Sequence, residues 1–318
     1  MAGAHGHRRR PGPSARRRPR SPFAAPTAES GGDLSDAAAI DESAIDESPT
    51  LPASASLVQP NPWENLRRHT AARIALGRVG SSLPTAEVLR LGLAHAQARD
   101  AVHDPLDFAA LRSELEADGW KPRQVRSQAP NRSAYLLRPD LGRRLNAADL
   151  ELLPPQPAAG DVATDVATDV ATELAIVVAD GLSSAAVRQH ARPLLAALRA
   201  SFDTDWANTP VVLVEQGRVA IGDEIGARLG ARLVAVLIGE RPGLSSPASL
   251  GIYLTYAPRP GRMDSERNCI SNVRPEGLAY AQAAHKLAYL CRAALRRQLT
   301  GVDLKDDSPL LAPPLGSG

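Results

Sequence analysis

The sequence predicts an α/β fold, and two observations on its C-terminal half carry that prediction. Continuous apolar runs occur at residues 174–178, 211–214 and 233–238, which is typical of strands buried on both faces. Helical segments separate these runs, and a strand–helix–strand alternation indicates βαβ units in a parallel sheet. We therefore expect a Rossmann-like parallel sheet with helices on both faces over residues 174–308, preceded by a mostly helical region and a polar tail.

The helices of this half follow from apolar spacing and stop signals. They are expected at residues 185–200, 217–230 and 279–299. Gly230 suits the end of the second helix, because glycine adopts the left-handed cap conformation without a steric penalty. The last helix carries apolar and small residues along one face: Tyr280, Ala284, Leu287, Cys291 and Ala294.

Residues 60–153 predict a mostly helical region without a deep apolar core of its own. A helix is expected from Pro62, a residue favoured in the first helical turn, to Gly77 as a stop. Further helices are expected at residues 84–103, 108–115 and 140–153, and short strands at Gln124–Arg126 and Ala134–Leu137. A region of this kind must pack on another surface.

Three low-complexity segments frame these regions. Residues 1–59 predict disorder, because they are polar and rich in Pro and Ser, with an arginine block at 8–20 and an acidic block at 29–47. The arginine-rich start also resembles a transit peptide in composition, and an address or docking role is the alternative to an inert tail. Residues 154–173 predict a repetitive linker without chemistry, and residues 309–318 a frayed end.

Composition excludes several classes of protein. The 318 residues carry a formal net charge of +2, which provides no drive toward nucleic acid or an anionic membrane. No run of 18 apolar residues occurs, so no transmembrane helix is expected. Two cysteines do not make a disulfide framework, which favours a reducing, cytoplasmic setting.

Ligands of open parallel sheets bind outside the carboxyl ends of the strands. Here these ends are residues 180–182, 215–217 and 239–241, each with a glycine that would let the backbone approach a bulky ligand. No G-x-G-x-x-G or Walker motif is present, so an ordinary nucleotide site is not indicated. Asp180 has two interpretations, a ligand contact or simply the start of the following helix.

The long segment 239–280 is rich in Gly, Pro, Arg, Asn and Ser, and contains a strand-like run at Ile252–Tyr256. Within it, Cys269 follows Arg267 and Asn268, and nearby cations lower a thiol pKa. A nucleophilic cysteine also needs a base, and no histidine lies near it in sequence, so we expect Cys269 to be a contact residue.

Two further sets of side chains are candidates for a site. His95 and His103 could share a helix face, but no clear third ligand accompanies them, so no metal site is predicted. A basic run in the long segment is either a solvated loop or a set of donors for an acidic partner or a phosphate. This run comprises Arg259, Arg262, Arg267 and Arg274.

Four stretches together resemble a known family. They are GERPGL at 239–244, LTYAPRPGR at 254–262, ERNCISNVRPEGL at 266–278 and LTGVDLKDDS at 299–308. This combination resembles the small subunit of ethanolamine ammonia-lyase, an adenosylcobalamin-dependent enzyme, and the resemblance covers most of residues 60–307.

The resemblance implies a division of labour between two chains. A larger TIM-barrel subunit would carry the substrate pocket and the radical chemistry, so no catalytic residue is expected in this chain. Adenosylcobalamin would lie between the subunits, with Val219 and Cys269 in van der Waals contact and Glu240 accepting hydrogen bonds from corrin amides. The chain has no D-x-H-x-x-G motif, so the cofactor would keep dimethylbenzimidazole on cobalt. Residues 60–153 would bind the large subunit.

The expected function is therefore the small subunit of a carbon–nitrogen lyase that converts ethanolamine to acetaldehyde and ammonia. Alone it would be inactive, and it would work in a hetero-oligomer of several large/small pairs. In some relatives the N-terminus loads the enzyme into a bacterial microcompartment. Two alternatives are a self-sufficient oxidoreductase, which the missing glycine fingerprint disfavours, and a non-catalytic scaffold or regulatory module.

Overall fold

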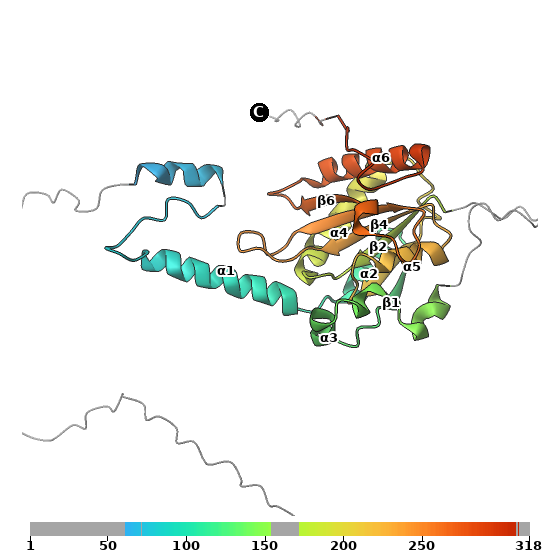
Figure 1. Ribbon diagram of the computed structural model, residues 1–318, viewed down its shortest axis with the longest axis horizontal. Coiled ribbons are helices and arrows are strands. Elements are labelled where there is room, and N and C mark those ends of the chain that lie inside the picture. Colours follow the sequence, from blue (N-terminus) through green and yellow to red (C-terminus); the bar gives the residue numbers. More distant parts are fainter. Residues whose placement is uncertain (1–60, 71, 154–171, 310, 312–318) are drawn as a thin grey trace, which may run out of the picture. The chain divides into compact units, whose positions relative to one another are not determined.

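The computed structural model describes residues 61–70, 72–153, 172–309 and 311 (Figure 1). The predicted N-terminal tail, nearly all of the repeat linker and most of the C-terminal tail lie outside these residues.

One mixed sheet organises the described part of the chain, with strand order β1-β3-β2-β4-β5-β6 (Figure 1). The strands are β1 (Pro122–Arg126), β2 (Leu174–Ala179), β3 (Val211–Glu215), β4 (Leu233–Gly239), β5 (Leu250–Tyr256) and β6 (Asn268–Val273). The first four strands in this order are parallel, β5 is antiparallel to β4, and β6 is antiparallel to β5. The α/β class is confirmed.

The prediction of a purely parallel sheet is wrong, and the reason lies in one connection. Only residues 240–249 join β4 to β5, which is too short for the crossover that a parallel neighbour needs, so the chain returns antiparallel. Strand β6 was not predicted, because Asn268–Val273 is polar and buries only Ile270 and Val273. Cys269 therefore lies on a strand and not in a loop.

Helices pack on both faces of the sheet. The α-helices are α1 (Thr85–His103), α2 (Phe108–Ala117), α3 (Arg132–Leu137), α4 (Ser184–Ser201), α5 (Ile221–Arg228) and α6 (Tyr280–Arg297). Helices α2, α4 and α6 bury their apolar residues with alternate strand residues such as Ile176 and Leu237. Helix α5 packs with the intervening strand residues, such as Val177 and Val236, on the opposite face. The period of two along each strand thus separates two core layers.

Several helix predictions of this half hold. Helix α4 ends within one residue of its prediction on either side, and α6 within two. Helix α5 is shorter than predicted, and Gly230 follows it with a φ of 59°, as a C-terminal cap requires.

The N-terminal part departs from its prediction at three places. The helix expected from Pro62 to Gly77 is a 3-10 helix, η1 (Pro62–His69). The strand expected at Ala134–Leu137 is helix α3, whose N-terminus is capped by Asn131. The helix expected at 140–153 is two 3-10 segments, η2 (Leu141–Arg143) and η3 (Ala147–Leu152).

The predicted boundary between a helical region and a sheet domain stays a prediction, but β1 crosses it. This strand comes from the N-terminal part and pairs with β3 in parallel register. Leu111, Leu115 and Trp120 enter the same core layer as α4 and α6. The apolar side chains of α2 and of Trp120 therefore have their partners within this chain.

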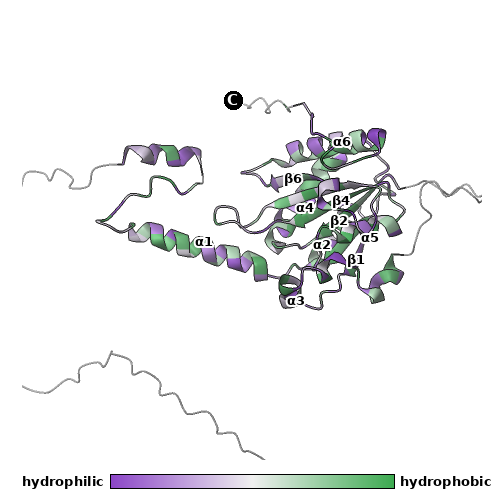
Figure 2. Cartoon of the chain, viewed as in Figure 1, coloured by the Kyte–Doolittle hydropathy of each residue, from purple (hydrophilic) through white to green (hydrophobic). Residues whose placement is uncertain are grey.

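Helix α1 differs from the other helices in what it leaves exposed. Only Glu87, Ala94 and Ala101 are buried along its 19 residues. On the side of the helix seen in Figure 2, apolar and polar residues alternate along its length. Its exposed large apolar side chains are Val88, Leu89 and Leu93.

Candidate functional site

The crevice at the carboxyl ends of β2 and β3 is closed by the chain itself. Connections from these neighbouring strands leave toward opposite faces, which is where open sheets ordinarily bind ligands. Helix α3 covers this point: Arg132 Nη1 donates to the Gly181 carbonyl at 2.8 Å and lies 3.5 Å from Asp180 Oδ2. The Tyr135 hydroxyl donates to the Gly217 carbonyl at 3.1 Å. Side chains of helix α3 therefore fill the place at this edge of the sheet where a ligand would otherwise bind.

Asp180 fits neither of its two predicted roles. Ser183, not Asp180, caps helix α4 by accepting a hydrogen bond from Ala186 N. Asp180 is 2 % exposed, and its Oδ1 accepts from Gly181 N and Gly217 N at 2.9 and 3.2 Å. Burial raises its pKa to about 6, against the opposing pull of the nearby guanidinium. Its buried carboxylate therefore links the turns that follow β2 and β3.

Gly181 and Gly239 allow two segments of this chain's own backbone to come close together, and the close approach does not serve a ligand. Gly181 adopts a φ of 60°, and a Cβ there would lie 2.3 Å from the Gly239 carbonyl oxygen. A Cβ on Gly239 would lie 2.1 Å from the Ser183 carbonyl oxygen. Leu182 N donates to the Gly239 carbonyl at 2.9 Å. The glycines therefore let the β2–α4 turn pack directly against the end of β4.

An open surface begins where β4 ends, on the face of the sheet that carries α5. Glu240 follows β4, and a Cβ on Gly251 of β5 would lie 3.1 Å from Glu240 Oε1 and 3.3 Å from Tyr253 Cε2. Tyr253 is directly opposite Cys269 in the β5–β6 ladder, and opposite residues share a face. Glu240, Tyr253 and Cys269 therefore lie side by side, the first two half-buried and the third exposed.

Val219 belongs to the same face. It lies between the end of β3 and helix α5 and packs, partly buried, against the core layer that contains Ile221 and Val236. Tyr253 packs against that same layer. The structure thus brings Val219, Glu240 and Cys269 to one face of the sheet, with Tyr253 as a neighbour that the sequence analysis missed.

The thiol of this surface is not activated. Desolvation by the surrounding atoms raises the pKa of the Cys269 thiol; a hydrogen bond with Tyr253 opposes the rise, and the Glu240 charge adds to it. Burial likewise raises the pKa of Tyr253. The cation that precedes Cys269 in sequence, Arg267, is directed elsewhere. A protonated thiol beside a neutral phenol agrees with a contact role and not with a nucleophile.

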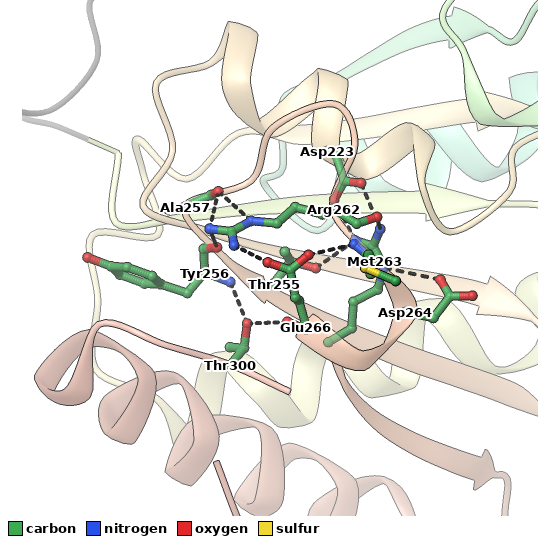
Figure 3. Close-up of polar contacts among 10 residues, drawn as sticks. Asp223, Thr255, Tyr256, Ala257, Arg262, Met263, Asp264, Glu266 and Thr300 are labelled. Carbon is green, nitrogen blue, oxygen red and sulfur yellow. Dashed lines mark hydrogen bonds and ion pairs between the residues drawn. The ribbon is translucent and has the colours of Figure 1, made fainter. Parts of the chain in front are cut away.

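A buried ion pair holds this face together (Figure 3). Arg267 Nη1 and Nη2 donate to Asp223 of α5 at 2.5 and 2.8 Å, and both side chains are 2 % exposed. Arg267 also donates to Thr255 Oγ1 of β5 at 3.1 Å and to the Arg262 carbonyl at 2.9 Å. Arg267 directly precedes β6, so the pair and the Thr255 hydrogen bond fix the start of α5 to β5 and to the beginning of β6.

Three of the four arginines of the basic run are engaged within the chain, and the fourth, Arg259, is exposed. Arg262 pairs with Glu266 and donates to the carbonyls of Tyr256 and Ala257 at 3.1 and 3.0 Å (Figure 3). Arg274 Nε donates to Asn272 Oδ1 at 2.8 Å. Most of these arginines therefore order the segment that carries them.

Metal sites and membrane-spanning helices are two further features to consider in the described residues. No cluster of three or more His, Cys, Asp or Glu side chains in these residues is arranged to hold a metal ion. No helix among them is long and apolar enough to cross a membrane.

A protein-family model described as ethanolamine ammonia-lyase light chain matches residues 60–305 of this sequence. The chain belongs to the ethanolamine ammonia-lyase small-subunit family. Three similar proteins, each named ethanolamine ammonia-lyase small subunit, come from Ralstonia nicotianae, Azotobacter vinelandii and Pseudomonas syringae pv. tomato. Their identities are 56 %, 57 % and 53 %, over 84 %, 78 % and 79 % of this chain and 96 %, 89 % and 85 % of theirs.

Membership of this family confirms the resemblance seen in the sequence. The family match includes the N-terminal helices as well as the sheet, and it leaves residues 1–59 outside. The relatives' names describe one subunit of a lyase, which implies a larger partner chain in those proteins.

Proposed function

We propose that this chain is the small subunit of an adenosylcobalamin-dependent ethanolamine ammonia-lyase and holds the corrin against a large catalytic subunit. Family membership and the common face of Val219, Glu240 and Cys269 support the proposal. As a carbon–nitrogen lyase, the complex would convert ethanolamine to acetaldehyde and ammonia. The small subunit alone would be inactive.

The residues of this face fit a large planar ligand with amides on its rim. Val219, the Tyr253 ring and the exposed Cys269 side chain offer apolar and weakly polar contact. Glu240 offers a carboxylate at the margin, and a carboxylate accepts hydrogen bonds from N–H donors. The missing side chain of Gly251 leaves room for that carboxylate beside Tyr253. A surface of this composition suits the edge and one face of a corrin.

When bound, adenosylcobalamin supplies the carbon radical that starts the reaction. This chain's part is to bind and orient. Val219 and Cys269 would fix the height of the ring above the sheet through van der Waals contact, and Glu240 would fix its rotation through the rim amides. The Arg267–Asp223 pair would keep α5 and β5 at a constant spacing, so that these contacts persist.

The absorption spectrum of the complex tests this proposal. The chain is co-expressed with its large partner, loaded with adenosylcobalamin, freed of excess and given ethanolamine. A retained corrin spectrum that shifts toward the cob(II)alamin form is expected. A stable complex that retains no corrin would instead favour a scaffold or regulatory module.

Helix α1 is our proposed contact with the large subunit. Leu89 and Leu93 are four residues apart and therefore share a helix face, and they are 68 % and 59 % exposed. Leucines this exposed on a helix that buries only three residues are typical of an interaction surface. We expect L89K together with L93K to weaken co-purification of the large subunit at least tenfold. Val302 is similarly exposed, at 63 %, far along the chain, and V302K is the control.

A further inference from the structure

A backbone hydrogen bond holds Glu240 in a strand-like position. It directly follows β4, whose last pair with β5 is Gly239 with Leu250. Glu240 N then donates to the Ser249 carbonyl at 3.0 Å, which extends the antiparallel ladder by one step. The Cα of Glu240 therefore has the fixed position of a strand residue, although it begins a loop.

One oxygen of its carboxylate is engaged twice by the protein. Ser249 Oγ donates to Glu240 Oε2 at 2.7 Å, and Ser249 is only 7 % exposed. Asn272 N donates to the same oxygen at 3.2 Å. Both donors are fixed, one by burial and the other by belonging to β6.

A bulge in β6 makes the second donor available. In the β5–β6 ladder, Leu250 pairs with Val273 and Ile252 with Ile270, so three steps on β6 face two on β5. Such a bulge leaves a residue unpaired in the ladder. Asn272 lies in this bulge with a φ of 58°, and its N–H turns to Glu240 instead.

The other oxygen has no donor among the described residues. Oε1 of Glu240 accepts no hydrogen bond there, and no described Lys, Arg or His forms an ion pair with this carboxylate. Gly251 lies beneath it, where a Cβ would be 3.1 Å from Oε1 and 3.2 Å from Cγ. The carboxylate can therefore lie close to β5, next to Tyr253, with one acceptor oxygen left over.

We propose that Ser249, the Asn272 backbone and the bare Cα of Gly251 are positioning groups that present only Oε1 of Glu240 to a neutral N–H donor on the corrin rim. The inference rests on the proposed function. An ionised carboxylate only accepts hydrogen bonds, so this arrangement selects a primary amide and rejects a carboxylate at the same place on the ring. The protein would therefore bind a corrin with this rim amide intact more tightly than one in which the amide is hydrolysed.

Equilibrium binding to the complex of both subunits tests this, with two probes. One is adenosylcobalamin and the other its monocarboxylate derivatives, each with one rim amide hydrolysed. The unmodified complex should bind one monocarboxylate at least tenfold more weakly than adenosylcobalamin. E240Q, which can donate as well as accept, should bring that ratio close to one.

The positioning role is tested by a double-mutant cycle. S249A should weaken adenosylcobalamin binding about tenfold, because the Glu240 side chain then loses its fixed orientation and must be ordered on binding. In an E240A background, S249A should have no further effect. S249T keeps the hydroxyl and should restore binding, and S245A on the exposed part of the same loop is the control.

A second variant covers the case in which S249A unfolds the loop. G251A places a methyl group against Oε1 and should weaken binding in the unmodified chain but not in E240A. Equal effects of S249A and G251A with and without Glu240 would overturn the positioning role. Absence of corrin from the unmodified complex would overturn the proposed function instead.

Discussion

At the scale of single residues, the Arg267–Asp223 pair is the most consequential interaction of the candidate face. Both charges are buried, and two hydrogen bonds join the guanidinium to the two carboxylate oxygens. Removing one partner leaves the other as an uncompensated buried charge, which is far more costly than never having had the pair.

We therefore expect R267M to lower the free energy of unfolding by about 3–5 kcal/mol. R259M removes an exposed arginine from the same segment and should change stability by less than about 0.5 kcal/mol. Urea unfolding of the two variants measures the difference. Similar losses in both would mean that the buried pair contributes nothing special.

Asp180 gives a pH-dependent prediction. Its pKa is about 6 in the folded chain and about 3.9 in an unfolded one. Between these values the folded state holds a proton that the unfolded state has released, so stability falls as pH rises through this window. D180N lacks this titration. Relative to the unmodified chain, its free energy of unfolding should rise between pH 4 and pH 7, by roughly 2 kcal/mol. Urea unfolding at several pH values would show it, and a constant difference would contradict it.

At the scale of elements, the turn from β2 into α4 depends on direct backbone packing against β4. Gly181 combines a φ of 60° with a Cβ position only 2.3 Å from the Gly239 oxygen. Gly119, which follows α2, has a φ of 82° but nothing within 4 Å of its Cβ position. A substitution at Gly119 therefore introduces backbone strain alone, whereas one at Gly181 introduces both backbone strain and steric overlap.

G119A should cost about 1–2 kcal/mol of stability through strain alone. G181A should cost a further 1–3 kcal/mol or more, roughly, because overpacking adds to the strain. Chemical denaturation of both variants gives the comparison. Equal costs would show that the β2–α4 turn moves aside easily.

Local sequence patterns predict some elements of this fold and miss others, and the reason differs from element to element. Helices α4 and α6 and strands β2, β3 and β4 were predicted because their apolar residues recur at a local period. Strand β6 was missed because its outward residues are polar, and its pairing with β5 depends on a partner distant in sequence. The run Ala134–Leu137 is short and contains Tyr and Leu, which favours a strand locally, whereas the signal for helix α3 is its Asn131 cap.

At the scale of the whole molecule, the family match unites parts that the sequence analysis had separated. It extends from residue 60 to residue 305 and includes α1, β1 and all later strands. The sheet makes the same connection physically, since β1 from the N-terminal part is its edge strand beside β3.

Removal of residues 1–59 should therefore leave both large-subunit association and corrin retention unchanged. Removal of residues 1–103, which also deletes α1, should abolish association with the large subunit. Co-purification and the corrin spectrum of the two truncated chains check this. Loss of the complex on the first truncation would place an essential contact within residues 1–59. A role of that segment in microcompartment loading would affect location alone.

The sequence by itself determined the α/β class, the family, and the main strands and helices of the C-terminal half. These follow from local periods and short motifs, which need no knowledge of distant partners. Only the tertiary structure decided the mixed strand order, the closing of the β2–β3 crevice by Arg132, and the hold of Ser249 and Asn272 on one oxygen of Glu240. These depend on register, a bulge and close backbone approach between segments far apart in the chain, and no local pattern encodes them.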